Sequence, residues 1–160
     1  MTETANQFLR RRTERSLRHF LELIKKIRPE NALRDFQPNW KDHQWGIGQD
    51  GSIAGIVIHV AGWMLLTKSL FEAHGTALVR SDFEDQNVPQ KEDWSAVLTW
   101  TEQIFQEWTM ALQNTPDSEF AGKRDWEGED ITLQSYIVEM YEHAVYHQGQ
   151  IEYLLQKGEQ

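Results

Sequence analysis

The segment from Ser52 to about Ala73 constrains the fold most, because it is apolar almost all the way round a helix. Ser52 is a favourable N-cap, and Gly75 follows the last apolar residues as a typical stop signal. A helix without a polar face must be covered by other elements. The sequence therefore predicts a buried helix with the apolar residues Ile53, Ile56, Val57, Ile58, Val60, Trp63, Met64, Leu65, Leu66 and Leu70.

Three further segments have apolar residues at helical spacing and can provide that cover. They span about 6–28, 93–114 and 132–157. Pro29 is expected to end the first, Pro116 follows the second, and Thr132 is suited to cap the third. We find no convincing strand pattern in the rest of the chain. The sequence thus predicts an all-α fold, a four-helix bundle with long connections.

The connections differ in what they are expected to do. Residues 76–92 are long enough to travel the length of a bundle, which permits two consecutive helices to run parallel. Residues 30–51 contain Trp40, His43 and Trp45, and we expect them to pack on one end of the bundle. Lys123 and Arg124 in the connection 117–130 could meet an anionic ligand, and the arginines between residues 10 and 18 could bind an anion or resemble a targeting sequence. We interpret both groups as solvated charges.

Two histidines stand four residues apart in the last helical segment. At roughly 100° per residue, His147 lies about 40° from His143, and both lie within or beside the apolar arc of the helix. Such a pair can hold one metal ion, whereas the structural alternative is two core histidines that are satisfied by hydrogen bonds. No His-Glu-x-x-His motif is present, which excludes the zincin type of site.

A third histidine interrupts the most apolar segment. A buried imidazole at His59 needs a hydrogen-bond partner or a metal, because leaving it without either is costly. For one isolated residue a hydrogen bond is the usual answer. Together with an inward-facing pair on another helix, His59 instead favours a metal site. His19 could be a fourth ligand, although a lone histidine is more often a core or boundary residue.

Composition limits the functional classes. A chain of 160 residues is expected to form one domain, covering 1–160. The chain has no cysteine, which excludes disulfides, cysteine-zinc sites and cysteine nucleophiles. Its formal net charge of -9 argues against broad attraction to nucleic acid. We see no signal-peptide pattern and no membrane span, so a soluble cytoplasmic protein is the expectation.

The two histidine segments resemble those of the DinB/YfiT-like superfamily. They read GSIAGIVIHVAGW at 51–63 and HAVYHQGQI at 143–151, the latter similar to the recurrent His-x-x-x-His-x-Gly-Gln-Ile ending of that family. The resemblance covers the order of all four helices. It implies an up-down-down-up bundle, frequently a homodimer, with one divalent ion (Zn, Ni or Fe) on His59, His143 and His147. Members include thiol S-transferases that use bacillithiol or glutathione, and mycothiol-dependent isomerases.

Three functional hypotheses follow. The first is a metal-dependent enzyme that transfers a low-molecular-weight thiol to an electrophilic small-molecule substrate, or a hydrolase that activates water at the same ion. The second is a non-catalytic, stress-associated bundle in which the ion clamps two helices together. The third is a plain structural bundle with three hydrogen-bonded histidines. The candidate groups behind the ligands are Gln150 and Tyr146, with Glu142 the weakest because it lies away from the pair on the helix.

Overall fold

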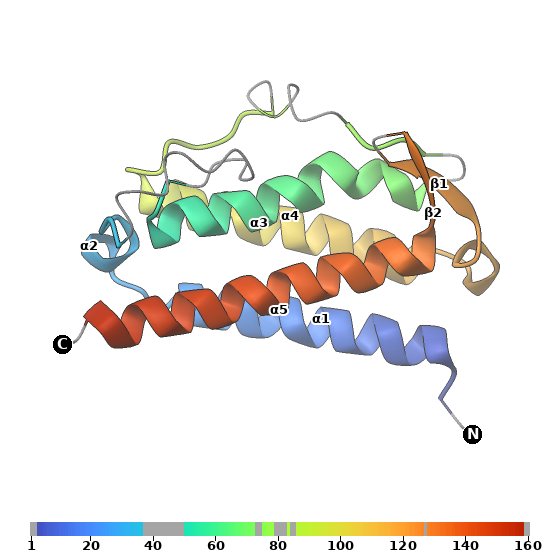
Figure 1. Cartoon of the computed structure of the whole chain (residues 1–160), viewed down its shortest axis with the longest axis horizontal. Coiled ribbons are helices and arrows are strands. Elements are labelled where there is room, and N and C mark those ends of the chain that lie inside the picture. Colours follow the sequence, from blue (N-terminus) through green and yellow to red (C-terminus); the bar gives the residue numbers. More distant parts are fainter. Residues whose placement is uncertain are drawn as a thin grey trace.

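Four long helices pack together in the computed structural model, which describes residues 3–36, 50–72, 75–78, 83, 86–126 and 128–158. They are α1 (Ala5–Ile24), α3 (Ile53–Thr67), α4 (Trp94–Asn114) and α5 (Leu133–Gly158). The smaller elements are α2 (Pro29–Ala32), the 3-10 turns η2 (Lys68–Phe71) and η4 (Asp117–Glu119), and the strands β1 (Lys123–Trp126) and β2 (Glu129–Thr132). The predicted four-helix bundle is confirmed, with a small hairpin added at one end (Figure 1).

The four long helices are arranged up-down-down-up in chain order. In Figure 1, α1 and α5 run one way, and α3 and α4 run the other way. Side-chain contacts agree, because Trp94 at the start of α4 donates through Nε1 to the Ile27 carbonyl, 3.1 Å away and just beyond the end of α1. At the opposite end, Arg10 Nε donates to the Leu112 carbonyl at 3.1 Å. Residues 86–92, the described part of the connection just before α4, run along the bundle toward the start of α4 (Figure 1).

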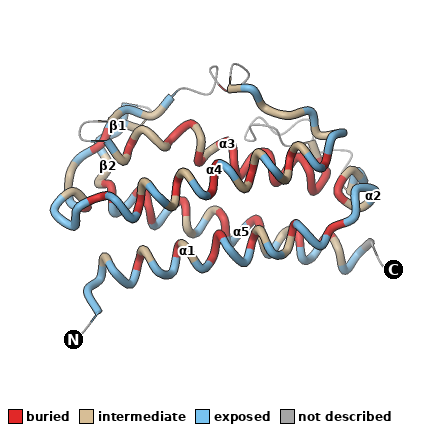
Figure 2. Tube along the Cα trace, turned by 180° about the vertical axis from the view of Figure 1, so that it is seen from behind, coloured by how far each residue is buried: buried red, intermediate tan, exposed pale blue. Residues whose placement is uncertain are grey.

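Helix α3 forms the centre of the core. All of its fifteen residues except Trp63 and Leu65 are buried, and Figure 2 shows this burial along its length. Contrary to the expectation from the sequence, Ile53–Phe71 is long and apolar enough by composition to cross a membrane. However, 83% of that window is buried inside the bundle, so packing against the other helices accounts for its apolar character.

The helix starts agree with the capping residues in the sequence. Ser52 Oγ accepts from the Gly55 N–H at 3.0 Å, and Thr132 Oγ1 accepts from the Ser135 N–H at 3.1 Å. The ends differ. Helix α1 stops at Ile24 instead of about Arg28, and Pro29 begins α2. The chain tightens into i to i+3 hydrogen bonds after Ile24, which turns Ile27 into the core. Helix α3 gives way to η2 after Thr67, short of the predicted Ala73.

The hairpin is the main departure from the predicted all-helical pattern. Strands β1 and β2 pair antiparallel around a turn in which Gly128 has a positive φ of 85°. The interpretation of Arg124 as a solvated charge is wrong, because this residue is 3% exposed. Its guanidinium donates to the Leu70 carbonyl at 2.7 Å and to Glu119 Oε2 at 2.9 Å. Arg124 therefore ties the hairpin to the end of η2, while Lys123 is exposed and pairs with Asp130.

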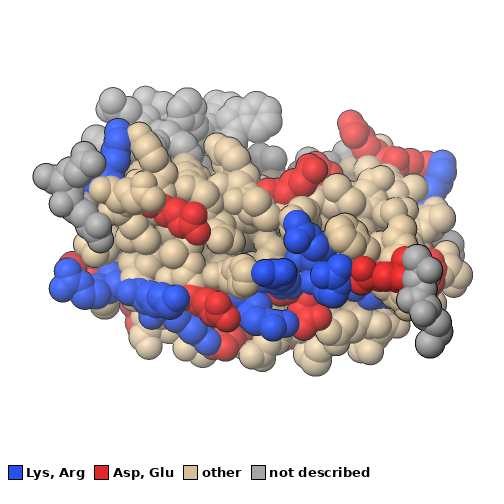
Figure 3. All heavy atoms as spheres, turned by 90° about the horizontal axis from the view of Figure 1, so that it is seen from below, with Lys and Arg blue, Asp and Glu red and all other residues tan. Residues whose placement is uncertain are grey.

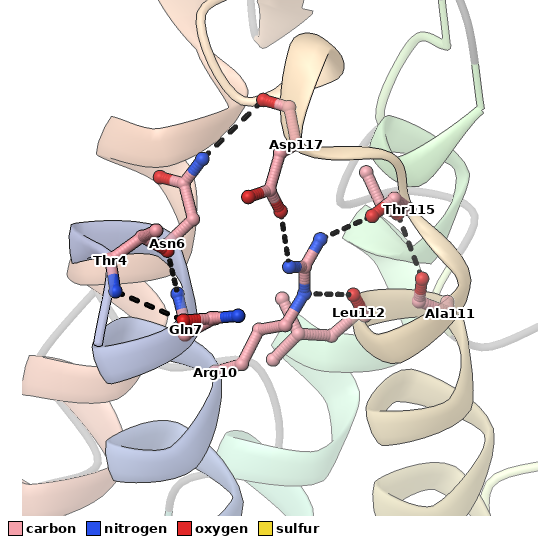
Figure 4. A network of polar contacts seen from close by, with 8 residues as sticks. All are labelled: Thr4, Asn6, Gln7, Arg10, Ala111, Leu112, Thr115 and Asp117. Carbon is pink, nitrogen blue, oxygen red and sulfur yellow. Dashed lines mark hydrogen bonds and ion pairs between the residues drawn. The ribbon is translucent and has the colours of Figure 1, made fainter. Parts of the chain in front are cut away.

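Arg10 also departs from the solvated helix face that the sequence predicted. Figure 4 shows its guanidinium directed at the C-terminal end of α4. It donates to the carbonyls of Leu112 and Thr115 and forms an ion pair with Asp117 at 2.6 Å. The last carbonyls of a helix lack partners within the helix and carry partial negative charge. Arg10 satisfies them and so fixes α1 against the end of α4.

Candidate metal centre

Helices α3 and α5 bring three histidines into one cluster. His59 lies in the middle of α3, and His143 and His147 lie one turn apart on α5, which packs against α3. One ring nitrogen from each of the three lies within 4.8 Å of the other two. His59 and His147 are each 4% exposed, and His143 is partly exposed. The structure thus joins the three residues that the sequence had marked separately on two helices.

The cluster is arranged around the Nε2 atoms. His143 Nε2 lies 3.0 Å from His59 Nε2 and 3.1 Å from His147 Nε2. Two nitrogens bound tetrahedrally to one zinc ion at about 2.0–2.1 Å lie about 3.3–3.4 Å apart. The observed separations are close to that spacing. The three histidines could therefore hold a metal ion with little movement of their rings.

Hydrogen bonds alone do not satisfy this arrangement. An imidazole nitrogen offers one in-plane position for a proton or a lone pair, yet His143 Nε2 faces two other Nε2 atoms. On the other side of the same ring, the buried Nδ1 of His143 has no hydrogen-bond partner among the described residues. A cation between the rings would accept all three Nε2 lone pairs at once, which a shared proton cannot do. The donor set therefore fits a metal ion.

Burial keeps the ring nitrogens available as ligands. Desolvation, together with the neighbouring His147 and His59, lowers the pKa of His143 to about 3. Desolvation also lowers the pKa of His147, although its hydrogen bond to Gln150 acts in the opposite direction. Both imidazoles are therefore neutral at pH 7. Neutral imidazole is the form that binds a metal.

These pKa shifts predict that metal binding resists acid. A lowered pKa preserves the neutral form as the pH falls, so protons compete with the metal only at lower pH. Three ordinary imidazoles would lose roughly a thousandfold in affinity between pH 7.5 and 5.5. For this protein we expect a loss of no more than about tenfold, measured by competition with a chromophoric zinc chelator at both pH values. A loss close to a thousandfold would show that the rings titrate as solvent-exposed histidines.

Gln150 orients one of the ligands. His147 Nδ1 lies 2.9 Å from Gln150 Oε1. An amide oxygen only accepts hydrogen bonds, so this contact assigns the ring proton to Nδ1 and directs the Nε2 lone pair of His147 at the cluster. Such supporting contacts fix the tautomer and the ring orientation of a metal ligand.

Replacing Gln150 with alanine should therefore weaken metal binding without abolishing it. We expect a loss of about tenfold, at the lower end of what removal of such partners costs. Isothermal titration of the metal-free protein with zinc measures this loss. Gln148→Ala is the matched control, because Gln148 lies on the same helix but donates to Glu152 at 3.1 Å and is not part of the three-histidine group. Equal losses in the two variants would remove the orienting role of Gln150.

The other candidates from the sequence lie apart from the Nε2 atoms. Tyr146 is 65% exposed and touches His147 with its ring, the centroids being 4.9 Å apart. Glu142 is exposed on α5. His19 is exposed on α1 and is not part of the three-histidine group. Trp40, His43 and Trp45 fall outside the described residues.

Two tryptophans near the cluster had not been assigned to it. Trp63, interpreted as a core residue, packs edge-on against His59 with a centroid distance of 6.4 Å. The sequence could have indicated this contact, because Trp63 follows His59 by four residues and therefore lies on the same helix face. The ring centroid of Trp126 in β1 lies 6.1 Å from that of Trp63. Trp126 also lines a cavity of about 250 Å³ together with Glu129, Ile131 and Glu139. Burial, and then repulsion by Glu142 and Glu129, raises the pKa of Glu139. No sequence pattern indicated that the hairpin would bring Trp126 here.

Comparison with known proteins found no match, so the interpretation of the site is based on its geometry. No family model matches this chain, and neither a curated protein nor a solved structure matches it. What stands is a mostly helical bundle with a buried three-histidine group that could bind a metal ion.

Proposed function

We propose that this chain is a metal-dependent enzyme of the DinB/YfiT-like type that transfers a low-molecular-weight thiol to an electrophilic substrate. The observation that carries the proposal is the convergence of three imidazoles, His59, His143 and His147, in one group. That group includes no fourth protein ligand among the described residues. Three protein ligands with an open position are the pattern of catalytic zinc, whereas structural zinc sites have four.

The chain's own residues have distinct roles in this proposal. His59 and His147 are buried ligands, and Gln150 holds the ring of His147 in place. His143 is the most exposed of the three, so substrates approach the cluster from its side. An ion held there would lower the pKa of a bound thiol or water molecule and so supply a nucleophile at neutral pH.

The absence of cysteine fits a thiol that comes from outside the protein. In such a transfer the thiol loses its proton to solvent water, its sulfur bonds to the electrophilic carbon, and the leaving group departs with the electron pair of the broken bond. Hydrolysis at the same centre would use water as the nucleophile instead. The sulfur-containing reactant therefore distinguishes the two reactions.

The second candidate function is a metal clamp between α3 and α5. It is supported by the origin of the ligands, since one comes from α3 and two come from α5. A clamp predicts that metal removal lowers the free energy of unfolding substantially and that no thiol reaches the ion. The enzyme predicts that metal removal leaves the fold largely intact and that a thiol binds the ion.

Cobalt-substituted protein separates these functions. We expect glutathione or bacillithiol to produce a thiolate-to-cobalt charge-transfer band in the wild type, and no band in His147→Ala. We also expect conjugation of the thiol to 1-chloro-2,4-dinitrobenzene to require both the metal and His147. A wild type that binds cobalt but shows no band at millimolar thiol, and that loses stability when the metal is removed, would replace the enzyme with the clamp.

A further inference from the structure

A second polar cavity lies on the other side of α5, at its seam with α1. It has a volume of about 260 Å³, and residues from both helices line it. Four come from α1 (Arg12, Arg15, Ser16 and His19), and two polar ones come from α5 (Tyr141 and Gln148). Tyr141 and Gln148 lie about 140–160° around α5 from His143. This cavity is therefore distinct from the histidine cluster, and its occupant is independent of the proposed enzyme function.

The charges of α1 are distributed unevenly around this cavity. Three arginines of the helix form ion pairs: Arg10 with Asp117, Arg11 with Glu3 and Arg18 with Glu14. Within the described residues, Arg12 and Arg15 form no ion pair, and these two line the cavity. Figure 3, which views the molecule from the side of α1 and α5, shows basic side chains along this face with acidic side chains between them. Neither cation therefore has a carboxylate partner within the described part of the chain, although the net charge of the chain is -9; Arg12 lies over the Phe8 ring at 5.9 Å.

A buried hydroxyl provides an independent observation. Ser16 lines the same cavity, is 9% exposed, and its Oγ has no hydrogen-bond partner among the described residues. A serine inside a helix normally bonds the carbonyl four residues back or faces solvent, and this one does neither. Buried polar atoms without a partner are rare, and each calls for an explanation such as a bound water, ion or ligand. A ligand that accepts hydrogen bonds would satisfy Ser16.

The lining can recognise an anion. Arg12 and Arg15 are permanent cations with several N–H donors each, and Tyr141 and Ser16 add hydroxyl donors. No carboxylate lines the cavity. Its volume corresponds to about nine water molecules, at about 30 Å³ each, which exceeds the needs of a single phosphate group. We propose that this cavity binds a phosphoryl dianion carried by a small molecule, with Arg12 and Arg15 neutralising the charge and Ser16 donating to a phosphoryl oxygen.

Titration calorimetry with defined phosphates tests this site. The probes are inorganic phosphate, glycerol 3-phosphate as a phosphomonoester, and acetate as a monoanion. We expect saturable binding of both phosphates, tighter for the monoester because it fills more of the cavity, and at least about tenfold weaker binding of acetate. Monoester binding no tighter than that of inorganic phosphate would restrict the site to the free ion and so overturn the small-molecule carrier. Absence of saturable phosphate binding would overturn the site itself.

Matched variants separate recognition from general charge effects. Arg12→Gln and Arg15→Gln should each weaken phosphate binding by about tenfold or more. Arg11→Gln removes the same charge from the same helix but outside the cavity, and should leave binding within about twofold. Equal losses in all three variants would reduce the effect to net charge and overturn the site.

Ser16→Ala separates a ligand group from a merely structural one. It should weaken phosphate binding while leaving the ligand-free protein equally stable or raising its melting temperature, because it removes an unsatisfied buried hydroxyl. A lower melting temperature with unchanged phosphate binding would contradict the role of Ser16. His147→Ala should bind phosphate like the wild type. The phosphate titration therefore tests the anion site independently of the metal site.

Discussion

Replacing His147 with alanine is expected to lower the affinity for zinc by about a hundredfold to a thousandfold. Zinc binding in small protein sites with four ligands provides about 10–16 kcal/mol in total, so one ligand contributes roughly 2.5–4 kcal/mol. His147 is buried, its Nε2 faces that of His143 at 3.1 Å, and its ring is held by Gln150. Alanine removes the ligand but keeps a good helix former in the middle of α5. The metal affinity should therefore fall while the far-ultraviolet circular dichroism is retained.

His19→Ala is the control for this substitution. It removes an exposed imidazole of α1 that lies outside the three-histidine group. Zinc titration of the metal-free proteins should give the same affinity for His19→Ala as for the wild type. Undiminished zinc affinity in His147→Ala would exclude the three-histidine assignment, and a loss of helical structure in that variant would favour the clamp.

Replacing Trp108 with alanine is expected to destabilise the fold by about 3–5 kcal/mol, the usual cost of truncating a large buried aromatic residue. Trp108 of α4 is fully buried, and its ring packs against Phe71 at a centroid distance of 4.8 Å. Its Nε1–H donates to the hydroxyl of Tyr136 on α5 at 2.8 Å, and that hydroxyl lies 2.7 Å from Thr67 Oγ1 at the end of α3. The substitution therefore opens a cavity and weakens a hydrogen-bond network that joins three helices.

Urea denaturation of metal-free protein measures this effect. A loss of about 4 kcal/mol corresponds to a decrease of roughly 8–16 °C in the melting temperature for a domain of this size. Trp100→Ala is the matched control, since Trp100 lies on the same helix and is only partly buried. Its cost should be clearly smaller. Similar costs for both tryptophans would mean that the network around Tyr136 adds nothing to the packing of the core.

The sequence was sufficient for the helices because their signals are long and consistent. The apolar run of α3 and the periodic stripe of α4 each extend over several turns, so single exceptions do not alter the pattern. The capping hydroxyls of Ser52 and Thr132 then located two helix starts within a residue. The length of the connection between α3 and α4 permitted their parallel arrangement to be anticipated from the sequence.

The hairpin and its buried arginine could not be predicted in the same way. Strands of four residues are too short to show a convincing alternation, and β1 contains the charged residues Lys123, Arg124 and Asp125. Arg124 is buried because Glu119, five residues earlier, and above all the Leu70 carbonyl, 54 residues earlier, supply acceptors once the chain folds. Arg10 follows the same rule, because its partners lie at the end of α4. Sequence patterns within one helix do not reveal such partners.

The candidate site was predictable to the extent that helix geometry determines it. His143 and His147 share a face by their spacing, and the apolar surroundings of His59 indicated that it is buried. The i+3 spacing also placed Gln150 near His147, where it now makes a hydrogen bond. Tyr146, one residue before His147, instead directs most of its surface to solvent. The packing of Trp126 against Trp63 depends on the hairpin and could not be predicted from the sequence.

The metal content of untagged protein tests the central claim most directly. Elemental analysis of the wild type, alongside His59→Ala and His147→Ala, should find about one divalent ion per chain in the wild type and almost none in either variant. The ligands from α3 and α5 would then act as one site. A wild type without metal, even after incubation with zinc, nickel and iron salts, would contradict the claim. The three histidines would then be hydrogen-bonded core residues, and the enzyme proposal would have to be abandoned.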